Sequence, residues 1–160
     1  MTTTPALDPE LDLVLTREVN APREILYMCW TTPEHLVHWF VPKPHKVTAC
    51  DLDVRVGGRC NTTFEVEGNE MQNNGVYLEV VPNEKLVFTD AYTEGWKPAP
   101  EPFMTAILLL ADAPDGADLE YVCVIAFADP ASAPPEPLLP PSLIEIVRVS
   151  LAGGVSVLIR

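Results

Sequence analysis

Basic residues are scarce in this sequence. Only 10 Lys and Arg stand against 23 Asp and Glu among 160 residues, so the formal net charge is −13. A negative field of this size repels phosphate backbones and anionic lipid headgroups. The charge therefore disfavours nucleic acid and membrane surfaces as partners. It is compatible with a small molecule or with another protein, and acidity alone selects neither.

Long apolar runs and targeting signals are also missing. The longest apolar run, AILLLA at 106–111, has the length of a strand and falls far short of the ~20 residues that a membrane span requires. The first five residues, MTTTP, lack the basic and apolar regions of a signal peptide. We therefore expect a cytoplasmic protein.

Cysteines are few, and no motif of a common enzyme class is present. Cys29, Cys50, Cys60 and Cys123 form no Cys-x-x-Cys pair, which favours free buried thiols over disulfides or a zinc site. There is no Gly-x-Ser-x-Gly elbow, phosphate-binding glycine loop or metalloprotease motif. We expect no cofactor and no catalytic residue of these classes.

Two histidines are close enough in sequence to suggest a metal site. His35 and His38 lie at i and i+3 of an expected helix, and His45 follows nearby. A metal site also needs a third ligand on the same face, and Glu34 and Cys29 are placed elsewhere by the helical period. A solvated helix face is the favoured interpretation.

Of the 160 residues, 48% are apolar and 21% are charged, which indicates one globular domain over 1–160. Residues 1–9 are expected to be disordered. A strand is expected at 11–19. A helix follows, with Asn20 as its cap, Pro22 in its first turn and Glu24 near its positive end. Pro33 then ends that helix and begins a second short one.

The rest of the chain alternates like strands. Strands at 47–56 and 60–66 are expected to join in a tight hairpin at Gly57-Gly58, and Asn73-Asn74-Gly75 is expected to form a second turn. Further strands are expected at 76–81, 85–91, 103–111 and 119–126, with the last two joined by a turn at 112–116.

Two segments resemble a known family. They are WTTPEHLVHWF at 30–40 and GVYLEVVPNEKLVFTDAYTEGW at 75–96. They are similar to segments of the START-like, birch-allergen-like helix-grip superfamily (SRPBCC), in the branch of the activator of the heat-shock protein 90 ATPase. The resemblance spans about 11–125. It implies an α+β helix-grip fold: a curved antiparallel sheet of six or seven strands, with two short N-terminal helices.

The C-terminal segment departs from that family. Relatives usually have a His where Phe127 falls and then a long helix with a Met-Gly-Phe-x-x-Gly-Trp motif, and neither is present here. Six prolines within 129–141 exclude a continuous helix there. Residues 127–160 are therefore a divergent, Pro-rich tail, for which a frameshift is favoured over true divergence. For 142–152 a helix is favoured over a hairpin at Gly153-Gly154.

The resemblance also implies a cavity between the curved sheet and the helices. The function expected from it is binding of a small hydrophobic or aromatic molecule, and an uncovered concave face would favour a homodimer. Met104 is a further candidate for the wall. It and its neighbour Phe103 face opposite sides of a regular strand, so at most one of the two belongs to the wall unless a bulge intervenes. The aromatic candidates for the cavity wall are Trp39, Phe40, Tyr77, Phe88, Tyr92, Trp96, Phe103 and Tyr121.

Two alternative functions stay open. The family grouping implies a module that interacts with a chaperone, as the ATPase activator does. An acid in an apolar cavity can also transfer protons, which suggests a cyclase-like enzyme that uses Asp90 and Glu94 beside the cavity. Ligand binding without catalysis is the favoured interpretation.

Overall fold

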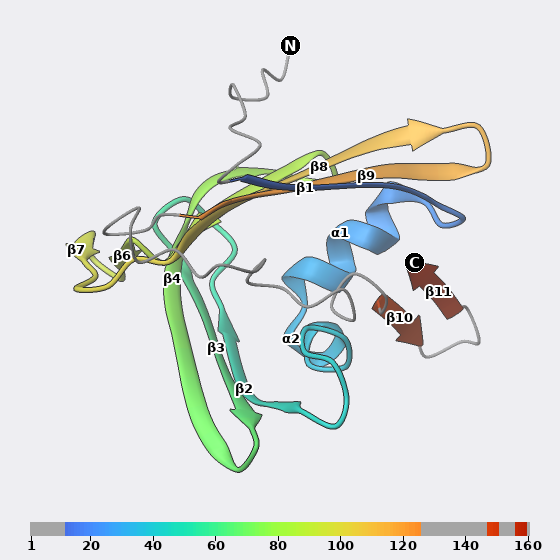
Figure 1. Ribbon diagram of the computed structural model, residues 1–160. Helices are drawn as coiled ribbons and strands as arrows, with labels where there is room; N and C mark the ends of the chain where they lie inside the picture. Colours follow the sequence, from blue (N-terminus) through green and yellow to red (C-terminus); the bar gives the residue numbers. More distant parts are fainter. Residues whose placement is uncertain (1–11, 126–146, 151–155, 160) are drawn as a thin grey trace.

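The computed structural model describes residues 12–125, 147–150 and 156–159 (Figure 1). Within these residues, seven antiparallel strands form one curved sheet in the order β1-β9-β8-β5-β4-β3-β2, and the sheet curls around two helices. This arrangement confirms the helix-grip fold. The strands are β1 Asp12–Val19, β2 Lys46–Leu52, β3 Arg59–Val66, β4 Asn69–Val81, β5 Lys85–Thr89, β8 Met104–Ala113 and β9 Gly116–Ile125.

The two expected helices are α1 Arg23–Thr31 and α2 Pro33–Leu36. Pro33 occupies the first turn of α2, where its missing N–H costs no hydrogen bond. The predicted cap at Asn20 is wrong, because α1 begins three residues later, after Pro22, and no side chain caps it. In the part of the chain that the structure describes, no helix has the length and apolar character needed to cross a membrane.

The main core lies between α1, α2 and the concave face of the sheet. Leu26 and Leu36 of the helices pack in the same cluster as Tyr77, Leu86 and Leu108 of the sheet, and each of these side chains is at most 4% exposed. A second, smaller cluster lies on the opposite face, because successive residues of a strand point to opposite sides. It contains Val87 and Ile107, with Leu78 and Leu109 beside them.

The connection between β2 and β3 is longer than predicted. β2 ends at Leu52, and a loop at 53–58 replaces the expected two-residue hairpin. The N–H of Asp53 donates to the carbonyl of Arg59 at 2.9 Å and closes this loop. Gly58 is required for a close approach, since a Cβ there would lie 1.9 Å from the carbonyl oxygen of Asp53.

The predicted turn at 73–75 is wrong. Strand β4 runs without interruption from Asn69 to Val81, and the turn before it lies at Glu67 and Gly68, which have φ angles of 51° and 81°. Gly75 is present for a different reason. A Cβ at this position would lie 2.3 Å from the carbonyl oxygen of Thr89, so only glycine lets the neighbouring backbone come this close.

Two small hairpins lie outside the main sheet. One joins β6 Tyr92–Thr93 to β7 Lys97–Pro98, and the other joins β10 Val147–Ser150 to β11 Ser156–Ile159. The helix favoured for 142–152 is wrong over 147–150, where β-branched residues pair in a strand instead. Residues 1–9 and the Pro-rich segment at 129–141 lie outside the described residues.

Candidate ligand-binding site

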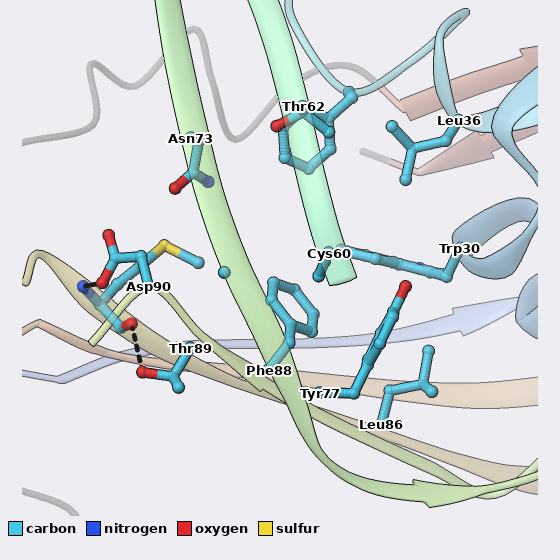
Figure 2. Close-up of a pocket in the computed structure, with 13 residues that line it drawn as sticks. Trp30, Leu36, Cys60, Thr62, Asn73, Tyr77, Leu86, Phe88, Thr89 and Asp90 are labelled. Atoms are coloured by element: carbon cyan, nitrogen blue, oxygen red, sulfur yellow. Dashed lines mark hydrogen bonds between the residues drawn. The ribbon is translucent and has the colours of Figure 1, made fainter. Parts of the chain in front are cut away.

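The concave face of the sheet holds a pocket beside the two helices (Figure 2). Apolar side chains form most of its wall, and polar side chains form one end. Its cavity has a volume of about 20 Å³, which is room for about one water molecule. The described lining residues are Trp30, Leu36, Phe40, Cys60, Thr62, Asn73, Gly75, Tyr77, Leu86, Phe88, Thr89, Asp90 and Met104.

The helical corner places the ring of Trp30 over the sheet. Trp39 packs edge-on against Trp30, with ring centroids 4.5 Å apart and an angle of 67° between the rings. The indole N–H of Trp39, which follows α2, donates to the carbonyl oxygen of Cys29 in α1 at 3.2 Å and ties the segment after α2 to α1. Trp30 in turn faces Phe88 of β5, with 6.1 Å between the ring centroids. The corner thus forms one wall of the pocket.

The sheet supplies an aromatic floor. Tyr77 and Phe88 are partners across β4 and β5, and their rings lie edge to face at 6.3 Å. The Tyr77 hydroxyl and the Cys60 thiol form a hydrogen bond. Burial raises the pKa of Tyr77, and burial also raises the pKa of Cys60 to about 12 although this hydrogen bond lowers it. Both groups are therefore neutral at physiological pH, and the thiol is a poor nucleophile.

We define the polar end of the pocket as Thr62, Asn73 and Asp90. Thr62 of β3 and Asn73 of β4 are direct partners in the sheet, so both side chains project from the same face. Asp90 follows β5, and its Oδ1 accepts hydrogen bonds from the N–H groups of Phe103 at 2.9 Å and Met104 at 3.0 Å. These bonds hold the carboxylate against the inner face of the sheet (Figure 2).

The hydroxyl of Thr62 is buried and has no hydrogen-bond partner within the described part of the chain. The residue is only 4% exposed. Thr89 lines the same pocket and is about as buried, but its hydroxyl has hydrogen-bond partners. Its hydroxyl lies 2.8 Å from that of Thr105 and donates to the carbonyl oxygen of Met104 at 3.2 Å. A buried hydroxyl without a partner carries a free-energy penalty that a ligand atom or a water molecule can remove.

Sequence and structure comparisons agree on the family. The model of the family described as "Activator of Hsp90 ATPase homolog 1-like protein" matches residues 20–134. The chain belongs to this family. The search of the curated proteins found no match.

Structures of several members of the superfamily resemble this one. Protein NE0264 from Nitrosomonas europaea is 36% identical, with a TM-score of 0.71 over 75% of this chain and 78% of that one. Protein CV1439 from Chromobacterium violaceum is 28% identical, with a TM-score of 0.63 over 74% and 81%. The AHSA1-like protein from Aeromonas hydrophila is 15% identical, with a TM-score of 0.60 over 78% and 79%, which supports the fold alone.

The structure places the predicted aromatic residues of this family member in three settings. Phe40, Tyr77 and Phe88 line the pocket. Of the neighbours Phe103 and Met104, Met104 lines the pocket and Phe103 is 45% exposed. The remaining residues do not line the pocket or have no described side chain. Trp39 lies behind Trp30 in the core, Tyr92 and Trp96 are 40% and 50% exposed on the β6–β7 hairpin, and Tyr121 lies in β9, where only the backbone is described.

Sequence reasoning missed Trp30, Thr62 and Asn73, and it named Asp90 only as a candidate acid beside the cavity. The alternation of residues along β4 carries the signal, because Asn73, Gly75 and Tyr77 occupy every second position and point to one face. Treating 73–75 as a turn hid this pattern. Trp30 has the spacing of an ordinary apolar helix residue, since it follows Leu26 by four positions, and nothing in the sequence distinguishes its pocket-facing ring from core.

The predicted acid pair is not brought together in the pocket. Asp90 lines the pocket, whereas Glu94 lies on the hairpin, where its carboxylate accepts from the Arg59 guanidinium at 2.8 Å. The same guanidinium donates to Asp51 at 2.8 Å, and these two hydrogen bonds raise the pKa of Arg59. Among the described residues no group of three His, Cys, Asp or Glu side chains has the arrangement of a metal site.

Proposed function

We propose that this domain binds a small hydrophobic or aromatic molecule in the pocket between the curved sheet and the helices. The observation that carries the proposal is the aromatic wall formed by Trp30, Tyr77 and Phe88 around a cavity with one polar end. Small-molecule sites are typically apolar concavities with a few polar groups that orient the ligand. Membership of the family supports the same function.

The cavity must enlarge when a ligand enters. Its volume of about 20 Å³ is far below the roughly 300–1,000 Å³ of ordinary ligand pockets. Trp30, Phe40 and Met104 are the side chains that we expect to move, because each is partly exposed. Tyr77 and Leu86, which are each 1% exposed, form the part of the wall that stays in place.

Filling the pocket tests this proposal. Naphthalene is the probe, and its dissociation constant is measured by titration calorimetry with the wild type and with Met104→Trp. The larger side chain should occupy the space of the ligand and abolish binding. Met28→Trp is the matched control, because Met28 is 37% exposed on α1 and does not line the pocket.

The same probe should also raise the melting temperature. A ligand at about 100 times its Kd stabilises the folded state by about 2.7 kcal/mol, which corresponds to roughly 5–10 °C for a domain of this size. The proposal fails if neither naphthalene nor a panel of similar hydrocarbons binds the folded wild type. It also fails if Met104→Trp and Met28→Trp bind the probe equally well.

A second candidate function is interaction with a chaperone, and the β6–β7 hairpin favours it. Tyr92 and Trp96 lie edge to face at 6.1 Å and are both exposed, and exposed aromatic residues are enriched in protein interfaces. Addition of the wild type should then increase the ATPase rate of an Hsp90, and Trp96→Ala should lose that effect while Met104→Trp keeps it. An unchanged rate with the wild type removes this candidate.

The remaining expectations stay predictions. A homodimer is tested by sedimentation, the cytoplasmic location by cell fractionation, and cyclase-like turnover by comparing the wild type with Asp90→Asn.

A further inference from the structure

The polar end of the pocket restricts what the ligand can carry. Three features of this end bear on the ligand: a buried hydroxyl without a partner, an amide next to it, and a fixed carboxylate. The ligand concerned is that of the same pocket, so the inference rests on the proposed function.

Thr62 requires a polar neighbour inside the pocket. Thr62 lines the cavity and is 4% exposed, and no atom of the described residues satisfies its hydroxyl. Asn73, its partner on β4, also lines the cavity, and among the described residues no hydrogen bond of its side-chain amide is recorded. A cavity of about 20 Å³ beside these groups has room for roughly one polar heavy atom, either a water oxygen or a ligand atom that replaces it.

Asp90, which lines the same pocket, restricts the polarity of a ligand group at this end. Its Oδ1 already accepts from two backbone N–H groups, and no ion pair of this carboxylate is recorded within the described residues. An ionised carboxylate only accepts hydrogen bonds. A ligand group that approaches it must therefore donate.

The charge around the pocket excludes anions. None of the described lining residues is Lys, Arg or His, so nothing in this wall compensates a second negative charge beside Asp90. The formal charge of the whole chain, −13, acts in the same direction. We infer that the pocket takes an apolar, ring-containing ligand with a single hydrogen-bond donor, a hydroxyl or an amine, at the polar end, and that it rejects ligands with a carboxylate there.

Three compounds with the same ring system test the inference. They are naphthalene, 2-naphthol and 2-naphthoate, and their dissociation constants are measured by titration calorimetry at neutral pH. A site built to bond a hydroxyl discriminates strongly against an analogue that lacks it. We expect 2-naphthol to bind at least about tenfold more tightly than naphthalene, and 2-naphthoate to bind more weakly than both.

Two variants assign the preference to the polar end. Thr62→Val keeps the shape of the side chain and removes its hydroxyl, so it should reduce the preference for 2-naphthol over naphthalene by about tenfold. Asp90→Asn removes the negative charge and should improve binding of 2-naphthoate. Circular dichroism and the melting temperature check that both variants fold.

The outcomes separate this inference from the proposed function. If naphthalene binds and 2-naphthol has no advantage, or if the advantage survives in Thr62→Val, the inference is overturned while the proposed function stands. Tighter binding of 2-naphthoate than of 2-naphthol to the wild type overturns it as well. If none of the three compounds binds, the proposed function fails and the inference fails with it.

Discussion

The pocket and the β6–β7 hairpin are both rich in aromatic residues, yet they use them in opposite ways. Tyr77 and Phe88 are at most 9% exposed and lie edge to face on the sheet. Tyr92 and Trp96 lie edge to face at a similar distance and are at least 40% exposed. All four residues come from one stretch of chain. The setting of an aromatic ring is therefore decided by the strand that carries it and by the helices above it, and not by its neighbours in sequence.

The surroundings of each pair explain the difference. Tyr77 lies in a long strand paired on both sides, and the helical corner covers it. Tyr92 lies in a two-residue ladder outside the main sheet, and Trp96 lies in the turn of the same hairpin. Glu94 of this turn forms an ion pair with Arg59 of the main sheet. An ion pair between exposed groups contributes little stability. We therefore expect the buried rings of Tyr77 and Phe88 to be essential for folding, and the exposed rings of Tyr92 and Trp96 to contribute little to the stability of the fold.

Removal of one ring from each pair should produce the largest contrast. We expect Tyr77→Ala to lower the free energy of unfolding by about 4 kcal/mol, because it leaves a cavity in the core. Tyr92→Ala should lower it by less than about 1 kcal/mol, since the ring is already 40% exposed. Urea unfolding at neutral pH measures both values.

Tyr77→Phe is the control for this first contrast. It keeps the ring and removes only the hydrogen bond to Cys60, so it should cost about 1 kcal/mol. Equal losses for Tyr77→Ala and Tyr92→Ala would contradict the division into a structural pair and a surface pair.

Glycine substitutions should sharpen the same contrast. In Gly75→Ala the new methyl group would lie 2.3 Å from the carbonyl oxygen of Thr89, so the two strands must separate, at an expected cost of about 3 kcal/mol. Gly95 of the hairpin has a φ of +77° and no atom within 4 Å of a new Cβ, so Gly95→Ala should cost only about 1 kcal/mol of backbone strain. Thermal unfolding measures the two losses, and a larger loss at Gly95 would show that the hairpin is the stiffer region.

These two glycines also illustrate how much the sequence could predict. The order of elements and the helical corner follow from the periodicity of the apolar residues and from Pro33, whereas the curved sheet is implied by the family resemblance. All three are present in the structure. The role of Gly75 was not predictable from its sequence neighbours, since Asn73-Asn74-Gly75 has the composition of a turn. Its cause is the backbone of β5, which lies more than ten residues away in sequence.

The polar end of the pocket escaped prediction for a related reason. Thr62 and Asn73 become partners only through the register of β3 and β4, and this register is set by a turn that sequence reasoning placed six residues too late. Asp90 was noticed as one acid among many. What distinguishes it from Glu94 is its position after β5, where the N–H groups of Phe103 and Met104 hold it.

The pocket should also make stability depend on pH above neutrality. Burial raises the pKa of Cys60 from 9.0 to about 12, so between these values the unfolded chain loses the thiol proton and the folded chain keeps it. The stability that this thiol contributes is fully present below pH 9 and falls as the pH rises, by up to about 1.4 kcal/mol per pH unit.

The measurement is the free energy of urea unfolding at pH 9 and pH 11. The wild type should lose about 2 kcal/mol more over this interval than Cys60→Ala does. Every other titratable group is present in both proteins, so the difference isolates the thiol. Identical losses in the two proteins would mean that the Cys60 thiol is as accessible to water as it is in the unfolded chain.

The smallest expected effects distinguish hydroxyls that look alike in sequence. Thr89→Val removes a hydroxyl with partners in Thr105 and Met104 and should destabilise the protein by about 1 kcal/mol. Thr62→Val removes a hydroxyl without a partner and should be neutral or stabilising by up to about 1 kcal/mol. Thr93→Val, on the exposed hairpin, should change the free energy of unfolding by less than about 0.5 kcal/mol. Thermal unfolding of the three variants measures this order. If Thr62→Val were as destabilising as Thr89→Val, a firmly bound water would already satisfy the Thr62 hydroxyl, and the ligand would have to compete with it.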